Sequence, residues 1–312
     1  MSALNKVRRA LLAFDSTSHG WGSISLRNAV HAIAPPVNPR KQTPSLTSFN
    51  ILASQIGPFG AIERSTRFLD CIFTSNSSTD IIHLQEVSSD VRQLLLDDSR
   101  VRAGFLLTDT EEHSGEFCGT PPRCENMTLL SNKRFGSESA SSVPVEDGDQ
   151  GERLTLRSVY HIDSLHMHRN ALGVDVAASD SSLVYRLLNL HFDPFRSRLR
   201  RFFQIRTLAN VLREPEYSGG GVIAGDFDTI FPEEERFFGE HSLVDAWTAL
   251  HGSAAAVNRR ASWGSQSVGR KRVDRVVMLG LKPHQIELIR LSPIERCASL
   301  SDRCGLRCTF TI

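Results

Sequence analysis

The chain has 312 residues, of which 40% are hydrophobic, and a formal net charge of +1 at pH 7. This length allows one large domain or two small ones, and the near-neutral charge excludes a surface that coats nucleic acid in bulk, leaving room only for a local basic site. The apolar runs are far too short to span a membrane, so we expect a protein without a membrane span.

Cysteine usage bears on the compartment and on metal chemistry. The six cysteines are Cys71, Cys118, Cys124, Cys297, Cys304 and Cys308. Because none of them forms a Cys-x-x-Cys pair, a structural zinc site is not expected. We expect all six to be free thiols in a reducing compartment, which predicts an intracellular protein, cytoplasmic or nuclear.

Residues 1–45 are expected to form an N-terminal leader, and the main domain is expected at residues 46–312. Asp15 is the only acidic residue of the leader, and the proline-rich stretch 35–44 reads as a linker. Four apolar residues near the start of the leader have the spacing of one helical face: Leu4, Val7, Leu11 and Phe14. Two interpretations follow: an amphipathic helix docked on the domain, which we favour, or a mitochondrial targeting segment.

Short apolar runs bounded by turn residues predict strands along the main domain. The predicted strands are 46–52, 80–87, 126–130, 171–176, 183–193, 221–228, 270–278 and 306–312, with 171–176 paired to 183–193. Predicted helices are 64–73, 91–96 and 196–212, and a further helix opens at 243–247. Residues 136–152 are expected to form an exposed loop, and the arginines of the third helix to be mostly solvated: Arg198, Arg200, Arg201 and Arg206.

The stretch around Asp226 and Asp228 is the most informative. The apolar run 222–224 lies between glycines and predicts a buried strand that ends at the two aspartates. Side chains two apart on a strand point the same way, so both carboxylates should face one side. Like charges this close repel each other unless a cation lies beside them. A polar turn after a core strand is the alternative.

Other predicted strands also end in polar side chains. These residues are Asn50, Glu86, His191 and Asp302. If the strands stack as a two-sheet sandwich, such ends converge on one rim. A site with several carboxylates and no cysteine suits Mg²⁺ or Mn²⁺, and a hard metal beside a histidine and an aspartate suits attack of water on a phosphoryl group.

The order of these motifs resembles the endonuclease/exonuclease/phosphatase superfamily, and is most similar to its 5′-tyrosyl-DNA phosphodiesterase-like branch. The stretches that carry the resemblance are Ser48-Phe49-Asn50-Ile51, Leu84-Gln85-Glu86-Val87, Met167-His168-Arg169-Asn170-Ala171-Leu172, Asn189-Leu190-His191, Gly225-Asp226-Phe227-Asp228, Val244-Asp245-Ala246-Trp247, Val273-Asp274-Arg275-Val276 and Ser301-Asp302-Arg303-Cys304-Gly305-Leu306. The resemblance implies an α+β fold: a four-layer αββα sandwich, deoxyribonuclease I-like, with two packed, mostly antiparallel sheets.

The resemblance also implies a role for each matching residue. Glu86 would ligate the divalent metal, with Asn50 close by. Asp226 would position or deprotonate the attacking water, and His191 would contact the scissile phosphate. Asp302 would help to hold the metal or orient its neighbour.

The chain departs from the family pattern at Asp228, where the family has asparagine, and at Arg303, where the family has histidine. An aspartate repels a phosphate oxygen unless it is protonated or metal-bound. Arginine binds phosphate well but cannot exchange a proton at neutral pH. Loss of a transition-state donor costs on the order of 10²–10³ in rate. Arg303 would replace part of that stabilisation, or would form a plain salt bridge.

Further candidates for substrate contact are Arg169, Asn170, Arg272 and Trp263. Three of them have a structural alternative: Arg169 would brace a carboxylate, the basic run around Arg272 would be a solvated edge, and Trp263, like Trp247, would be a packing residue. We expect Asp245 and Asp274 to have a structural role, or to support the residues of the site, rather than to be catalytic.

The sequence therefore predicts a Mg²⁺- or Mn²⁺-dependent phosphodiesterase, a monomer that hydrolyses a DNA 5′-end adduct or a related nucleic-acid phosphodiester, as in DNA repair. One alternative is a degenerate member, a pseudoenzyme that binds a phosphorylated ligand with little turnover because of Asp228 and Arg303. Another keeps the metal site but takes a small phosphorylated metabolite or a lipid headgroup.

Overall fold

The structure is a computed structural model of the whole chain. It describes residues 6–26, 42–51, 53–74, 79–108, 125–136, 153–162, 171–178, 183–192, 198–214, 218–228, 235–252, 272–291 and 304–312. The predicted loop at residues 136–152 lies almost wholly outside the described residues.

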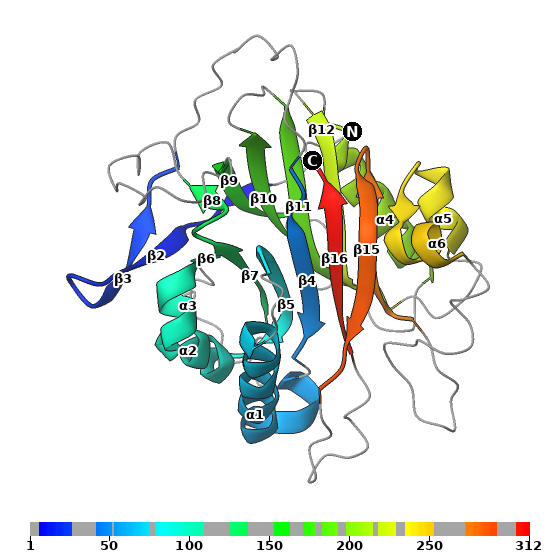
Figure 1. Cartoon of the computed structure of the whole chain (residues 1–312). Coiled ribbons are helices and arrows are strands. Elements are labelled where there is room, and N and C mark those ends of the chain that lie inside the picture. The colour runs from blue at the N-terminus through cyan, green and yellow to red at the C-terminus, as the bar shows by residue number, and fades with distance from the viewer. Residues whose placement is uncertain are drawn as a thin grey trace.

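Two eight-stranded sheets form the centre of the molecule (Figure 1). Sheet A has the spatial order β1 (Lys6–Arg8), β9 (Leu154–Ile162), β10 (Ala171–Ala178), β11 (Val184–His191), β12 (Ser218–Asp226), β14 (Asp274–Leu279) and β13 (Val244–Asp245), and β8 (Phe135–Gly136) pairs with β9. Sheet B has the order β15 (Lys282–Ile289), β16 (Gly305–Thr311), β4 (Ser45–Asn50), β5 (Ile81–Val87), β7 (Glu125–Ser131), β6 (Phe105–Thr108), β2 (Leu11–Asp15) and β3 (Gly20–Ile24).

Each sheet is mostly antiparallel but has one parallel pair near its middle. These pairs are β4–β5 in sheet B and β11–β12 in sheet A. Parallel neighbours need a crossover connection, and helices supply it: α1 (Ala53–Thr74) follows β4, and α4 (Arg198–Leu212) follows β11. The two parallel pairs matter for function because their carboxyl ends carry most of the polar residues singled out in the sequence.

Helices cover the outer faces of both sheets, which gives four layers. The remaining helices are α2 (Ser89–Asp97), α3 (Ser99–Gly104), α5 (Glu235–Glu240) and α6 (Ala246–His251). Three apolar clusters fill the spaces between layers: one between the sheets, one between sheet B and α1–α3, and one between sheet A and α4–α5. The predicted αββα sandwich of two mostly antiparallel sheets is confirmed.

Strand alternation decides which side chains face the space between the sheets. In β12, Val222 and Ala224 pack in the cluster between the sheets, whereas Ile223 packs against the helices outside. Asp226 continues the inward series. In β4, Leu46 faces inward and Phe49 outward, so Asn50 also points inward. The two sheets therefore present polar side chains to each other at one end of the sandwich.

The helical interpretation of the N-terminal segment is wrong. Residues 6–8, 11–15 and 20–24 are strands: β1 pairs with β9 at the edge of sheet A, and β2 and β3 complete the edge of sheet B. Leu11 is fully buried in the core between the sheets. The short apolar run 10–14 also fits a strand, and pairing with two open sheet edges favours the strand.

Two further sequence expectations concern side-chain exposure and membrane insertion. Arg201, expected to be solvated on the surface of α4, is instead completely buried. Trp247 is buried at 2% exposure, as a packing residue should be. Within the described parts of the chain, no helix has the length and apolarity needed to cross a membrane.

Candidate functional site

Five buried polar residues meet at the carboxyl ends of the two parallel strand pairs. Sheet B contributes Asn50 and Glu86, and sheet A contributes His191, Asp226 and Asp228. All five are at most 7% exposed. Buried charges need partners or a bound ion, so such a group indicates a site rather than ordinary core packing.

The end of β12 is shaped by a glycine. Gly225 has a φ of 148°, and a Cβ at this position would lie 1.9 Å from the carbonyl oxygen of Leu190, so no other residue fits beside β11. The chain then turns: the backbone nitrogen of Asp228 donates a 3.1 Å hydrogen bond to Oδ1 of Asp226. Asp228 itself has a φ of 46°, a conformation that Asp tolerates better than most residues. This turn keeps both carboxylates at the same rim.

An irregularity in β5 brings Glu86 to the site. The pairing of β5 with β7 shifts register between Leu84 and Val87, and Glu86 has a φ of 55°. In a regular strand Glu86 would follow Leu84 outward, toward the helices. The bulge instead redirects its side chain, so that Oε1 lies 3.3 Å from Nδ2 of Asn50.

Asn50 links the carboxylates of the two sheets. Its side-chain amide nitrogen Nδ2 donates to Oε1 of Glu86 at 3.3 Å and to Oδ2 of Asp226 at 3.0 Å. Both acceptors are carboxylates, which fixes the orientation of the amide and leaves its oxygen pointing away from them. Asn50 thus holds the two carboxylates close together across the gap between the sheets.

His191 completes the group. Its Nε2 atom lies 3.9 Å from Oε1 of Glu86, 3.9 Å from Oδ2 of Asp226 and 3.8 Å from Oδ2 of Asp228. Three carboxylates thus surround one imidazole nitrogen. Three negative charges at this spacing repel one another strongly unless positive charge is placed among them.

The donor set fits a hard divalent cation. One ligand atom from each of His191, Asp226 and Asp228 lies within 4.8 Å of the others. Carboxylate oxygens are the preferred ligands of Mg²⁺ and Mn²⁺, and a cation would relieve the repulsion. Glu86, the metal ligand implied by the resemblance, lies outside this trio, but its Oε1 is within 3.9 Å of the same histidine.

A second layer of polar residues lies beneath the site. The sequence analysis does not predict it. Nε2 of Gln85 donates to Oδ1 of Asn189 at 2.7 Å, which joins sheet B to sheet A. Nδ2 of Asn189 donates in turn to the carbonyl oxygens of Leu84 at 3.1 Å and Met127 at 2.9 Å. The signals in the sequence are two polar residues on the inward faces of their strands: Gln85, next to Glu86, and Asn189, two residues before His191.

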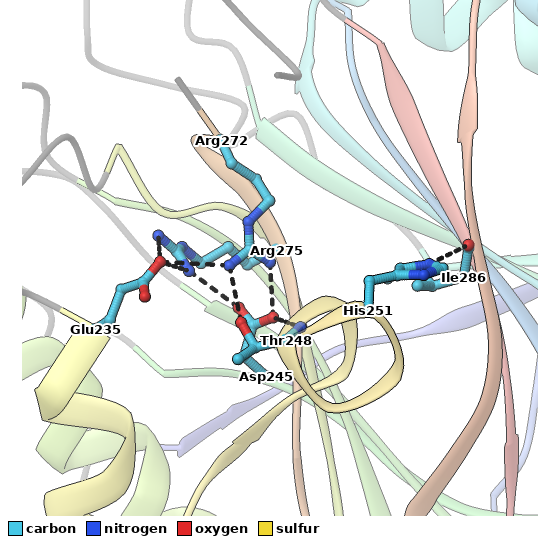
Figure 2. A network of polar contacts seen from close by, with 7 residues as sticks. All are labelled: Glu235, Asp245, Thr248, His251, Arg272, Arg275 and Ile286. Atoms are coloured by element: carbon cyan, nitrogen blue, oxygen red, sulfur yellow. Dashed lines mark hydrogen bonds and ion pairs between the residues drawn. The ribbon is translucent and has the colours of Figure 1, made fainter. Parts of the chain in front are cut away.

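Arg272 lies in a separate buried network (Figure 2). Its Nη1 atom donates to Oδ1 of Asp245 at 2.6 Å, and Nη1 of Arg275 donates to Oδ2 of the same carboxylate at 2.9 Å. Glu235 contacts both arginines, and Asp245 also caps α6 by accepting from the backbone nitrogen of Thr248. The side chain of Arg272 is only 4% exposed and contacts this network rather than Asn50 and its neighbours.

The charges in this network control the state of its carboxylate. Burial alone would raise the pKa of Asp245, but the adjacent guanidinium groups of Arg275 and Arg272 outweigh it and hold that pKa below its usual value. Asp245 therefore favours its ionised form, in which it is a counter-charge to both arginines. Asp274 starts β14, where it is the Cα partner of Asp226, and is 2% exposed.

The other predicted site residues lie outside the described residues. These are Arg169, Asn170, Trp263, Asp302 and Arg303. Their roles stay predictions.

Comparisons with known proteins were made by family model, by sequence and by structure. No family model matches the chain, and no curated protein sequence does. Solved structures do match. D. rerio TDP2 complexed with single strand DNA product is 18% identical, with a TM-score of 0.55 over 86% of this chain and 98% of that one. The human Nocturnin catalytic domain with bound sulfate is 17% identical, with a TM-score of 0.59 over 86% and 93%.

A bacterial structure carries the family description itself. The endonuclease/exonuclease/phosphatase from Bacteroides vulgatus is 13% identical, with a TM-score of 0.54 over 87% of this chain and 99% of that one. Similarity at this level of identity concerns the fold. The resemblance drawn from the ordered motifs is confirmed at that level: the chain has the fold of the endonuclease/exonuclease/phosphatase superfamily, with TDP2 among its structural relatives.

Proposed function

We propose that this protein is a divalent-metal-dependent phosphodiesterase that hydrolyses a nucleic-acid phosphodiester. The observation that carries the proposal is the convergence of Glu86, Asp226 and Asp228 on Nε2 of His191, each within 3.9 Å. Isolated polar turns would not bring carboxylates from both sheets to one atom. Hydrolysis of phosphodiesters needs charge stabilisation and a base for water, and this group supplies both.

The residues divide between two tasks. Asp226 and Asp228, with Glu86 adjacent, would hold the cation, which when bound would neutralise charge on the phosphate oxygens. Asp226 would orient and deprotonate the attacking water. Asn50, which bridges Glu86 and Asp226, keeps the carboxylates in their relative positions. His191 would donate to a phosphate oxygen, and Asp302 and Arg303 would act at the same phosphate as the sequence motif predicts.

A nucleic-acid end is the substrate class that we favour, with a DNA 5′-end adduct as the specific form. The support is the ordered motif set, together with the structural relative crystallised with a single-stranded DNA product. The near-neutral net charge fits recognition of a strand end better than coating of a long duplex.

Asp228 favours one alternative, a binding protein with little turnover. It adds a buried carboxylate, 2% exposed, at a position where the family motif has a neutral amide. Its Oδ2 lies 3.8 Å from Nε2 of His191, so it competes with a phosphate oxygen for the same donor. On this reading the protein binds a phosphorylated ligand, and Asp228→Asn with Arg303→His would increase hydrolysis.

The experiment compares substrates and variants. Purified protein is incubated with a 5′-phosphotyrosyl oligonucleotide, a 5′-phosphorylated oligonucleotide and a small aryl phosphodiester, each with Mg²⁺, with Mn²⁺ and with chelator. Glu86→Gln is the test variant because it keeps the shape and removes the charge. Glu63→Gln on the exposed surface of α1 is the matched control.

We expect metal-dependent release of tyrosine from the adduct, lost in Glu86→Gln and retained in Glu63→Gln. Cleavage of the small diester alone would support the proposed phosphodiesterase activity but overturn the proposed nucleic-acid substrate class. Binding of the oligonucleotide without cleavage of any substrate would overturn the proposed enzymatic activity and support the alternative of a binding protein with little turnover.

A further inference from the structure

A cavity lies where the N-terminal segment crosses from sheet A to sheet B. It has a volume of about 170 Å³ and is lined by Arg8, Arg9, Ala10, Ser23, Ile24, Leu26, Arg157, Ser158 and Val159. These residues come from the end of β1, the connection to β2, the end of β3 and the middle of β9. We call it the N-terminal cavity. The strands that carry it lie on the opposite side of the molecule from α5 and α6 (Figure 1).

The lining is strongly cationic. Three of its residues are arginines, Arg8, Arg9 and Arg157, and none of the lining residues that the structure describes is acidic. Nearby Asp175 accepts hydrogen bonds from the hydroxyls of Ser158 and Tyr160. Guanidinium groups gathered at one hollow raise the local positive potential, which attracts an anion.

Local backbone structure directs one of these arginines. The pairing of β9 with β10 shifts register so that Ser158 lies opposite Asp175 and Leu156 opposite Val176, which leaves Arg157 as the extra residue of a β-bulge. Bulges redirect side chains and occur often beside binding sites. Arg9 is also held in place, because its Nε donates a 3.2 Å hydrogen bond to Nδ1 of His161.

The size of the cavity suits a small anion. A cavity of about 150 Å³ holds a six-atom ring such as benzene, so about 170 Å³ has room for a tetrahedral group of five heavy atoms. Arginine forks match phosphate oxygens, and Ser23 adds a hydroxyl at the rim.

We propose that the N-terminal cavity is a phosphate-binding site, separate from the group at Asn50 and Asp226. In sheet A, β1 and β11 are three strands apart, which is about 14 Å at the usual strand spacing. The phosphate would belong either to a nucleic-acid strand that runs along the molecule or to a small phosphorylated molecule. The proposal does not depend on the proposed activity.

The test measures binding of inorganic phosphate to the full chain by calorimetry, in the presence of chelator. The variants are Arg157→Gln, Arg8→Gln and Ser23→Asp, the last of which places a carboxylate at the rim of the cavity. Arg236→Gln is the control, because it removes the same charge from the exposed surface of α5. Thermal unfolding of each variant shows whether it is folded.

We expect each arginine variant to weaken phosphate binding about tenfold, since each removes a charge-assisted contact. Ser23→Asp should abolish it, and Arg236→Gln should leave it unchanged. Because Arg8 and Ser23 are exposed, those two variants keep the test valid if Arg157→Gln does not fold. Equal phosphate binding by the wild type, Arg8→Gln and Ser23→Asp would overturn the proposal.

A second arm identifies the source of the phosphate. Binding of a labelled single-stranded oligonucleotide is measured against salt for the wild type and Arg8→Gln. If a nucleic-acid strand crosses the cavity, Arg8→Gln should bind the oligonucleotide more weakly than the wild type. The slope of the logarithm of the binding constant against the logarithm of the salt concentration should then be smaller by about 0.7. Unchanged oligonucleotide binding, together with weakened phosphate binding, would assign the cavity to a small phosphorylated molecule.

Discussion

Gln85 and Asn189 join the two sheets beneath the candidate site through a 2.7 Å hydrogen bond between Nε2 and Oδ1. Both side chains are completely buried. Gln85 immediately precedes Glu86, and Asn189 lies two residues before His191. The distance between the two halves of the site therefore depends on the combined length of these two side chains.

Exchanging the two residues tests this link. Gln85→Asn shortens one side chain by a methylene, and Asn189→Gln lengthens the other. Each single change should cost about 1–3 kcal/mol in the free energy of unfolding, because a buried polar group loses its partner. The double exchange should recover part of that cost in denaturant unfolding. A double variant as unstable as the sum of the two singles would show that the contact does not link the sheets.

The network around Asp245 should be necessary for folding. Asp245→Asn removes the buried counter-charge of Arg272 and Arg275 and leaves them only the partly exposed Glu235, and removal of one partner from a buried ion pair costs about 3–5 kcal/mol. Glu235→Gln is the control, because its side chain is 36% exposed and screened by solvent. Denaturant unfolding should show a much larger loss for Asp245→Asn than for Glu235→Gln. Equal losses would contradict the assigned role.

Buried His83 predicts how stability depends on pH. Burial lowers the pKa of His83 from 6.5 to about 3, although a backbone hydrogen bond with Ala224 opposes the shift. Between these values the unfolded chain binds a proton that the folded protein does not. The contribution of neutral His83 to the free energy of unfolding is therefore complete above pH 6.5. It is lost as the pH falls toward 3, by about 1.4 kcal/mol per pH unit.

The measurement compares unfolding free energies of the wild type and His83→Gln at pH 7.5, 5.5 and 4.5. Other groups titrate over the same range, so the difference between the two proteins is the informative quantity. The wild type should lose stability faster on acidification. Parallel pH profiles would show that the histidine is not buried in its neutral form.

Metal affinity should depend on Asp228. Asp228→Asn removes one charge from the trio with His191 and Asp226, and affinity for a hard cation falls with the charge of its ligands. We expect Mn²⁺ binding, measured by calorimetry, to weaken about tenfold or more. Unchanged affinity would place the metal on Glu86 and Asp226 alone.

The sequence predicted the fold and the location of the site because both depend on local patterns. The glycine-bounded run before Asp226 and the polar residues after apolar strands mark the ends of central strands, and their order along the chain is that of the family. Contacts between distant residues were harder to predict. Nothing local shows that Gln85 and Asn189 meet, or that a bulge turns Glu86 inward.

The errors have a physical origin as well. Leu11 and Phe14 have the spacing of a helical face, whereas in the strand they point to opposite sides, and pairing with the open edges of the sheets decides in favour of strands. Arg201 was assigned to solvent because arginine is usually exposed, whereas the fold buries it completely on α4. In both cases, contacts with parts of the chain that are distant in sequence determine the result: the strand conformation of the N-terminal segment and the burial of Arg201.

We propose above that one metal-dependent hydrolytic site is formed by Glu86, Asp226, Asp228 and His191. The most direct measurement is the rate of hydrolysis of a small aryl phosphodiester by the wild type and Asp226→Asn, with Mg²⁺ and with chelator. We expect hydrolysis that requires metal and falls at least about 10²-fold in the variant. Hydrolysis that persists in chelator, or that Asp226→Asn leaves unchanged, would contradict it.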